Sequence, residues 1–561
     1  MATVIFLFLL LSLTFLKLII QGVYLFHKLQ QVGYLNLKFL KWLESDKYRE
    51  VLLWSVFELL APLFTILLFY YLIGQKNIGY YKYFTSSLMI IVFLWKIAHP
   101  FLVGWVGPKA KYKKPLVFTP RVIRLFITLV LIILGLLGFV YYYTAMPLDQ
   151  FTLSSWNFFK FNAFLLFVSV IAPIIALSSN IVNYPIEKAF HFFYFSKAKK
   201  KLLNSGLINV GITGSYGKTS VKFFTATILG AKYKTLFTPS SFNTPMGISK
   251  IVNSTNLSNY QYFVCEMGAD HKGDIEVLCN LVGPDFSIIS SIDIQHLETF
   301  GSLQNIIKTK ISLFKNTDKN GFGIYNYDSE ILKESVKNNY FDLKIYSYSV
   351  IEENIKDCDI IAKDIKHTRK GLEFTAVLKS GEIIEVKTKL LGQHNASNLL
   401  AAILCAKLLG LNIDEIKDGL RKIEPVEHRL QLIEGAGGVL VLDDAFNSNL
   451  KGALEALKVL KEIDGNKKII ITPGIIELAE KQDEINFIFG RYIANFSDIA
   501  ILVGKKQTAR IYDGLKEMKF NEKNIFIAPN LEGAQKILSE IINQGDVVLF
   551  ENDLPDALSE S

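Results

Sequence analysis

Residues 207–220 read LINVGITGSYGKTS, and this stretch decides the fold of the second half of the chain. Its first part, residues 207–212, is an apolar run typical of a buried β-strand. An apolar helical pattern begins at Val221. A strand, a glycine-containing turn and then a helix is the context in which a loop binds phosphate, because the glycines let backbone N–H groups and the helix N-terminus point at phosphate oxygens. The stretch therefore predicts an α/β nucleotide-binding domain.

The turn supplies the side chains that such a loop needs. Lys218 places a positive charge beside the β- and γ-phosphates, and the hydroxyl of Thr219 can ligate Mg²⁺. Ile212 stands where the general pattern has its first glycine. We expect ATP and Mg²⁺ as cofactors. The residues expected to contact the nucleotide here are Thr213, Gly214, Ser215, Tyr216, Gly217, Lys218, Thr219 and Ser220.

Polar side chains also follow later apolar runs. Glu266 ends one such run, which places its carboxylate at the C-terminal edge of a parallel strand, facing the site crevice. His296 and Asp444 each follow another strand-like run. Asn395 and Asn398 are three residues apart and share one face of a predicted helix. These side chains are candidates for a single site.

These segments resemble, in order and spacing, those of the Mur ligases, and most of all the members that add D-Ala-D-Ala to the muramyl peptide. The resemblance covers residues 205–555 and implies a central ATP-binding domain at 205–390 and a Rossmann-like α/β C-terminal domain at 391–561. The matching segments are TGSYGKTS at 213–220, EMGA at 266–269, HLETFGS at 296–302, HNASN at 394–398 and DDAFNSN at 443–449.

The resemblance also implies roles for single residues. Glu266 and His296 would be metal ligands together with Thr219. Lys310 would be carboxylated by CO₂ and become an anion near the metals. Arg429 would reach the phosphates from the C-terminal domain. Asn395 and Asn398 would contact the nucleotide, and Asp444 the ribose. The implied catalytic residues are Lys218, His296, Lys310 and Arg429.

The implied reaction has two steps. ATP phosphorylates a substrate carboxylate, and an amine then attacks the acyl phosphate to give an amide, ADP and phosphate. Phe446 and Leu450 stand where the family has Tyr and Pro, so the amine, an amino acid or a dipeptide, stays open. By this resemblance, the apolar segments and linker before residue 205 stand where the family has its UDP-binding domain. The donor therefore stays open between a UDP-linked muramyl peptide, a lipid-linked one and a polyglutamate-type polymer.

The first third of the chain has a different character. Five apolar segments, at residues 4–26, 51–74, 84–106, 122–143 and 161–182, are each long enough to cross a bilayer as a helix. The loops after the first and third segments and the stretch after the fifth are basic, whereas residues 144–159 contain no Lys or Arg. Basic loops stay in the cytoplasm. We expect a multi-pass helical bundle in the inner or plasma membrane at 1–182, with the N-terminus outside, a linker at 183–204 and the ligase domains in the cytoplasm.

The amino-acid composition narrows the classes of protein and of binding partner that remain open. The net charge of +9 comes largely from Lys and Arg beside the apolar segments, which favours membrane lipid over nucleic acid as a partner. Four cysteines far apart form neither a disulfide framework nor a zinc site. A membrane transporter driven by a phosphate-loop ATPase is the alternative from another class. The sequence has no LSGGQ-type signature, and a transporter would not need the segments at 394–398 and 443–449.

Overall fold

The computed structural model describes residues 2–44, 116–145 and 160–552, apart from short gaps at 162–163, 166, 169, 240–241, 296, 369–370, 426–429, 446–449, 477 and 479–480. The chain divides into two compact units, Met1–His191 and Phe192–Ser561. The described parts of each unit have their own hydrophobic core. The predicted membrane segments 51–74 and 84–106 lie outside the described residues.

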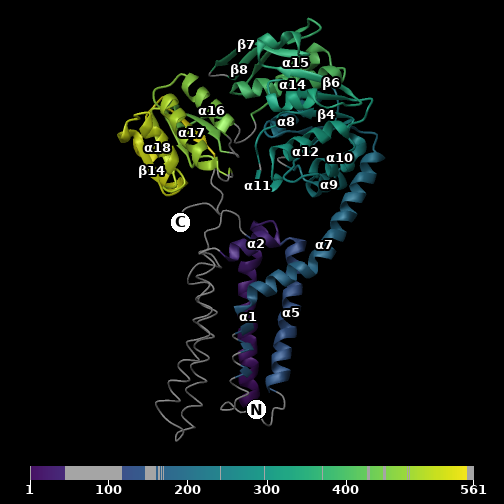
Figure 1. The fold of residues 1–561 in the computed structure, drawn as a ribbon, viewed down its shortest axis with the longest axis vertical. Helices are drawn as coiled ribbons and strands as arrows, with labels where there is room; N and C mark the ends of the chain where they lie inside the picture. Colours follow the sequence, from purple (N-terminus) through teal and green to yellow (C-terminus); the bar gives the residue numbers. More distant parts are fainter. Residues whose placement is uncertain are drawn as a thin grey trace. The chain divides into compact units, whose positions relative to one another are not determined.

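The described part of the first unit is helical. It contains α1 (Ala2–Gln31), α2 (Asn36–Leu43), α5 (Pro120–Ala145) and the first part of α7 (Ala172–Leu203). Helices α1 and α5 lie side by side (Figure 1) and share a core that includes Leu25, Phe26 and Leu129. Within the described residues, Pro120–Tyr143, with a mean hydropathy of 2.7, is the one helix long and apolar enough to cross a membrane. The five-segment bundle therefore stays a prediction.

Polar contacts connect the described helices of this unit. Arg124 on α5 forms an ion pair of 2.5 Å with Glu187 on α7, whose side chain is buried. The guanidinium of Arg121 lies 3.9 Å from the centre of the Tyr34 ring, and Asn180 donates to the side chain of Asn36 at 2.7 Å. A buried carboxylate requires such a partner, so the Arg124–Glu187 pair fixes how α5 and α7 pack within this unit.

The segment predicted as a linker is helical up to Leu203, because α7 continues through it. Pro185 lies inside this helix, where it removes one backbone hydrogen bond. The last turns of α7 are stabilised by burial, since Ala198 and Leu202 belong to the core of the second unit.

The second unit begins with a nine-stranded sheet in the order β2-β3-β1-β4-β5-β6-β7-β8-β9. The strands from β2 to β7 are parallel, and β8 and β9 extend the sheet antiparallel. Strand β1 is buried along almost its whole length, as an interior parallel strand must be. The bounds are β1 (Ile208–Thr213), β2 (Thr235–Phe237), β3 (Tyr262–Glu266), β4 (Phe286–Ile289), β5 (Phe322–Asn326), β6 (Lys344–Ser349), β7 (Ile360–Thr368), β8 (Gly371–Leu378) and β9 (Ile383–Thr388).

Helices cover both faces of this sheet. One hydrophobic core lies under α8 (Lys218–Leu229), α14 (Gln393–Leu408) and α15 (Ile413–Leu420), and Figure 1 shows α8 and α14 together beside the strands. The other core lies under the end of α7 and a second group of helices. That group includes α9 (Pro245–Ser254), α10 (Asp274–Val282), α11 (Leu297–Phe300), α12 (Leu303–Lys315) and α13 (Glu330–Lys337).

The second sheet has six strands in the order β10-β11-β15-β12-β13-β14, and only β10 runs antiparallel to its neighbour. Helices α16, α17 and α18 share one of its cores, and α19 packs on the other. The bounds are β10 (Gln431–Glu434), β11 (Leu440–Asp444), α16 (Leu450–Glu462), β12 (Lys468–Thr472), α17 (Gln482–Phe496), β13 (Ile499–Val503), α18 (Ala509–Glu517), β14 (Ile525–Ala528), α19 (Leu531–Ile541) and β15 (Val547–Glu551).

The prediction of two successive α/β parts is confirmed, with antiparallel strands at one edge of each sheet. The start of the C-terminal domain at residue 391 stays a prediction. Helices α14 and α15, together with Ile423, belong to the core of the first sheet. The apolar side chains of α14 cover α8, so this helix completes the first α/β layer.

Close packing of α15 on α8 gives a test of this fold. A Cβ atom on Gly419 would lie 2.6 Å from the Cα of Ile228, and backbone cannot move aside cheaply. We expect Gly419→Ala to lower the free energy of unfolding of the second unit by about 1–3 kcal/mol. Denaturant unfolding of the purified protein measures this. Asp418→Ala, at an exposed position of the same helix, is the control and should change stability by less than about 0.5 kcal/mol. Equal stabilities of the two variants would contradict the packing.

Candidate functional site

The predicted phosphate loop lies between the end of β1 at Thr213 and the start of α8 at Lys218. The Thr213 hydroxyl donates to the carbonyl of Met267, just after β3, at 2.8 Å. Beyond β4, the carbonyl of Ser291 accepts from the N–H of Ser215 at 2.9 Å, and the Ser291 hydroxyl accepts from the N–H of Tyr216 at 2.9 Å. The loop is therefore held by the ends of both neighbouring strands.

Two glycines of the loop have no room for a side chain. Gly217 has a φ of +80°, and a Cβ there would lie 2.6 Å from the Oδ1 of Asn398. At Gly214 a Cβ would lie 2.1 Å from the Oγ of Ser290. The sequence pattern therefore places glycine where backbone conformation and close approach both require it.

Two lysines converge on the start of this loop. The Nζ of Lys218 donates to the carbonyls of Gly214 and Ser215 at 2.8 and 3.1 Å. The Nζ of Lys310, on α12, donates to the same Gly214 carbonyl at 2.9 Å, and its side chain is buried. Burial, and then the positive charge of Lys218, hold the pKa of the Lys310 amine well below its usual range. A larger share of this amine is therefore uncharged near neutral pH.

Glu266, at the end of β3, is the buried carboxylate of the site. Its Oε2 lies 3.3 Å from the Nζ of Lys222, and its Oε1 accepts from the Nδ2 of Asn243 at 3.2 Å. Burial lowers the pKa of the Lys222 amine, and the Glu266 carboxylate acts in the opposite direction. Hydroxyl and carboxylate oxygens, as on Thr219 and Glu266, are the ligands that Mg²⁺ prefers. Over the described ranges, no three His, Cys, Asp or Glu side chains gather as a metal cluster.

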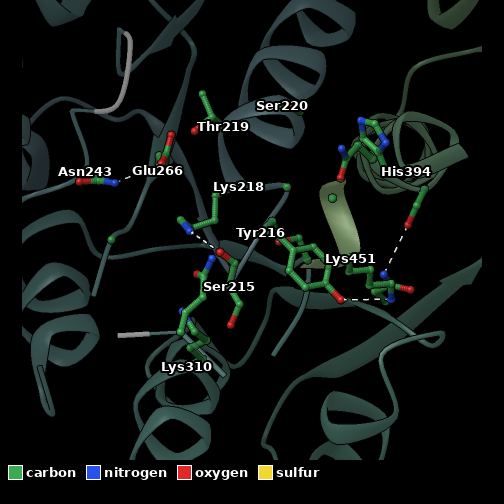
Figure 2. A pocket seen from close by; sticks show the side chains of 18 of the residues that line it. Ser215, Tyr216, Lys218, Thr219, Ser220, Asn243, Glu266, Lys310, His394 and Lys451 are labelled. Atoms are coloured by element: carbon green, nitrogen blue, oxygen red, sulfur yellow. Dashed lines mark hydrogen bonds between the residues drawn. The ribbon is translucent and has the colours of Figure 1, made fainter. Parts of the chain in front are cut away.

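Lys218, Glu266 and Lys310 line a cavity of about 860 Å³, which is within the size range of small-molecule and cofactor sites. Figure 2 shows Glu266 with Asn243, Lys218 and Lys310 near Ser215, and Lys451 directed at Tyr216. The cavity lining comes from the phosphate loop, the ends of strands of the first sheet, α14 and the start of the second sheet's domain.

The second sheet's domain contributes through β11 and α16. Asp444 ends β11 and lines the cavity, and its Oδ1 accepts from the N–H of Leu430 at 3.0 Å. Lys451, in the first turn of α16, donates to the Tyr216 hydroxyl at 3.3 Å. The cavity is thus lined by side chains from elements that pack around two separate hydrophobic cores.

The structure brings most of the predicted site residues together. Three of those that the structure describes are not among the residues that line the cavity. Thr213 and Gly214 form the base of the loop, and the Nδ2 of Asn395 donates to the carbonyl of Leu391 at 2.7 Å. His296 and Arg429 lie outside the described residues. The predicted residues that line the cavity are Ser215, Tyr216, Gly217, Lys218, Thr219, Ser220, Glu266, Lys310, Asn398 and Asp444.

Sequence reasoning missed several contributors, among them Lys222, Asn243 and Lys451. Among these three, the only available signal was for Lys222, which is four residues after Lys218 and therefore shares a helix face with it. Asn243 lies in a loop, and Lys451 lies on α16, in the domain of the second sheet. No local sequence pattern therefore marks either residue as part of the site.

Gly217→Ala tests the loop geometry. The substitution adds about 1–3 kcal/mol of backbone strain, and its Cβ collides with Asn398, so we expect ADP to bind about tenfold more weakly or worse. Isothermal titration with ADP measures this. Gly230→Ala, at the other end of α8 with a φ of −64°, is the control and should bind ADP like the unaltered protein. Unchanged ADP affinity of Gly217→Ala would contradict the site.

The chain matches two family models in succession. The model described as the Mur ligase middle domain matches residues 212–406, and the one described as the Mur ligase, glutamate ligase domain, matches residues 428–551. The break between them agrees with the change of core after Ile423.

Individual relatives agree with these matches. The UDP-N-acetylmuramoyl-tripeptide--D-alanyl-D-alanine ligase of Escherichia coli K12 is 33% identical over 303 residues, which are 54% of this chain and 65% of that protein. The ligase of the same name from Haemophilus influenzae is 31% identical over 336 residues, 58% of this chain and 70% of that protein. The crystal structure of MurF ligase from Thermotoga maritima in complex with ADP shares the fold, with a TM-score of 0.56 at 23% identity, covering 65% of this chain and 80% of that one.

The predicted family and enzyme class are therefore confirmed, in preference to a transport ATPase. Both α/β parts, the phosphate loop and the order of the matched segments agree with a relative that is 31% identical and covered over 70% of its length. The chain belongs to the Mur ligase family, the ATP-dependent, ADP-forming, amide-bond-forming ligases of peptidoglycan synthesis.

Proposed function

We propose that this chain adds D-Ala-D-Ala, or a similar amine, to the carboxylate of a muramyl peptide through an acyl phosphate. The observation that carries the proposal is the cavity in which Lys218, Glu266 and Lys310 lie with Asn398 and Asp444. It is supported by the relatives, whose names state a muramoyl-tripeptide and D-alanyl-D-alanine as substrates.

The phosphate loop would hold the nucleotide. Its backbone N–H groups and the N-terminus of α8 favour phosphate oxygens, and Lys218 balances the negative charge of the transferring phosphoryl group. Thr219, Glu266 and, by family resemblance, His296 would hold Mg²⁺, which supplies further positive charge to that group. Arg429 would add its guanidinium from the C-terminal domain.

Lys310 would act in a modified form. In this hypothesis its uncharged Nζ attacks the carbon of CO₂, a new N–C bond forms and one proton is released, which leaves a carbamate anion. Two observations support it: burial and the charge of Lys218 lower the pKa of this amine, and its Nζ donates to the backbone carbonyl of Gly214 at 2.9 Å. The anion would lie close to the oxygen ligands of the metal and orient it.

Asn398 and Asp444 would complete the nucleotide site, with Asn395 as a second family-implied contact. Their position around the cavity supports a role in excluding water, which would otherwise hydrolyse the acyl phosphate before the amine arrives. The division of the ligase part into a central domain and a C-terminal domain also belongs to this proposal. An open arrangement of the two domains would admit the substrates, and closure would then enclose them.

We further propose that residues 1–182 form a multi-pass membrane domain in the inner or plasma membrane, with the ligase domains in the cytoplasm. The apolar helix Pro120–Tyr143 and the basic loops predicted around the apolar segments support this. A lipid-linked donor is the second candidate substrate, because the family match begins only at residue 212, after these segments. A polyglutamate-type donor remains the third.

Phosphate release in detergent tests the ligase proposal. We expect release from ATP and Mg²⁺ only when both a muramyl-peptide donor and D-Ala-D-Ala are present, with UDP-linked and lipid-linked donors compared side by side. Lys310→Met should lose at least about 99% of this rate, because catalytic groups contribute factors of about 10²–10⁴. Lys308→Met, exposed on the same helix, is the matched control and should keep the rate. Release that needs neither substrate would overturn the proposal.

Cysteine labelling tests the membrane topology. The four native cysteines are buried, so single introduced cysteines at Ala2 and at the exposed Ser539 can be read against a low background. A membrane-impermeant maleimide added to intact cells should label Ala2→Cys and leave Ser539→Cys unlabelled until the membrane is opened. The reverse pattern would overturn the proposed orientation.

A further inference from the structure

Glu266 is held by two side chains that belong to different elements. The Nζ of Lys222, on α8, lies 3.3 Å from one carboxylate oxygen, and the Nδ2 of Asn243 lies 3.2 Å from the other. The side chains of Lys222 and Glu266 are 0% and 1% exposed. Each oxygen therefore receives an N–H donor from its own direction, and rotation of the carboxylate would break both contacts.

The position of Asn243 is itself fixed by the backbone. Its carbonyl accepts from the N–H of Gly268, two residues after Glu266, at 2.9 Å. Gly268 lies so close that a Cβ there would be 2.6 Å from the Asn243 Cγ. The Glu266 N–H in turn donates to the hydroxyl of Thr238 at 3.2 Å. The segment before α9 is thus anchored to the end of β3 at the residue that carries the carboxylate.

Lys222 reaches the cavity through Glu266. Glu266 and Asn243 both line the cavity, whereas Lys222 does not. A fully buried ion pair contributes little net stability compared with a well-packed apolar pair, so its presence favours a role in orienting the side of the carboxylate that lines the cavity. Groups that hydrogen-bond a metal ligand set its orientation and its affinity for the metal.

We propose that Lys222 and Asn243 are positioning residues that fix the Glu266 carboxylate for a divalent cation beside the nucleotide. This rests on the proposed role of Glu266 as a metal ligand. Lys222 holds the oxygen on the α8 side and neutralises its charge within the protein, and Asn243 holds the opposite oxygen. The remaining lone pairs of the carboxylate are directed into the cavity.

Binding of Mn²⁺, as a spectroscopic stand-in for Mg²⁺, tests the proposal without turnover. The full-length protein in detergent is loaded with ADP and titrated with Mn²⁺, and free Mn²⁺ is followed by electron paramagnetic resonance. We expect Lys222→Met to weaken Mn²⁺ binding by about 10–100-fold, the usual effect of removing a group that orients a metal ligand. Lys250→Met, exposed on α9, is the control and should leave the affinity unchanged.

Two further variants separate orientation from folding. Asn243→Ala removes a neutral donor and creates no unpaired buried charge, so it should fold and still weaken Mn²⁺ binding several-fold. Lys222→Met combined with Glu266→Gln should bind Mn²⁺ no more weakly than Glu266→Gln alone, because Lys222 acts through Glu266. Additive losses in the double variant would overturn the proposal, since they would show an independent contact.

Two other outcomes of the Mn²⁺ titration would also overturn the proposed positioning role. Unchanged or tighter Mn²⁺ binding in folded Lys222→Met and Asn243→Ala would show that the two residues serve only packing, or that Lys222 competes with the cation. Unaltered binding in Glu266→Gln would remove the ligand on which the inference rests. The titration needs neither donor nor amine, so it can fail while the ligase assay succeeds, and the reverse.

Discussion

The parallel pairing of β1 with β3 on one side and β4 on the other is the constraint on which the site depends. In this register Ile212 lies opposite Glu266, and Thr213 lies opposite Ile289. The carboxyl ends of all three strands therefore meet at one edge, where the loop after β1 can bond to Met267 and Ser291. A slip of one residue would turn the Glu266 side chain to the other face of the sheet, so the apolar cores on both faces also fix the chemistry of the edge.

Three amines lie near the place where the loop would hold phosphate. The amines of Lys218, Lys222 and Lys310 are all close to the loop or to β3, and Glu266 is the carboxylate paired with one of them. Burying such amines is costly, and the structure offsets part of that cost by directing two of them at the Gly214 carbonyl. The phosphates of a bound nucleotide would lie beside the Lys218 amine, while the carboxylates of Asp270, Asp274 and Asp328 line the same cavity.

Sequence patterns predicted the parts of the site that are local. The strand, loop and helix around Gly214 and Lys218 follow from an apolar run and glycine spacing, and Glu266 follows from its place at the end of another apolar run. Lys222 and Asn243 could not be found in this way, because their role arises from tertiary contact with Glu266. The packing partner of α14 could not be predicted for a related reason. The helix pattern of α14 is visible in the sequence, but the partner on which it packs is not.

The cavity is lined by two parts of the chain that pack around separate hydrophobic cores, and this has a consequence for catalysis. Asp444, Lys451 and Glu455 come from the domain of the second sheet, whose helices pack around a core of their own. Lys451 on α16 contacts the phosphate loop through the Tyr216 hydroxyl, at 3.3 Å. Polar contacts of this kind contribute about 0.5–1.5 kcal/mol each, whereas each sheet is held by its whole apolar core. A change in the spacing of the two parts therefore alters the cavity while leaving both folds intact. In a reaction that forms an acyl phosphate, such a site can admit its substrates while open and exclude water once the nucleotide brings the two sides together.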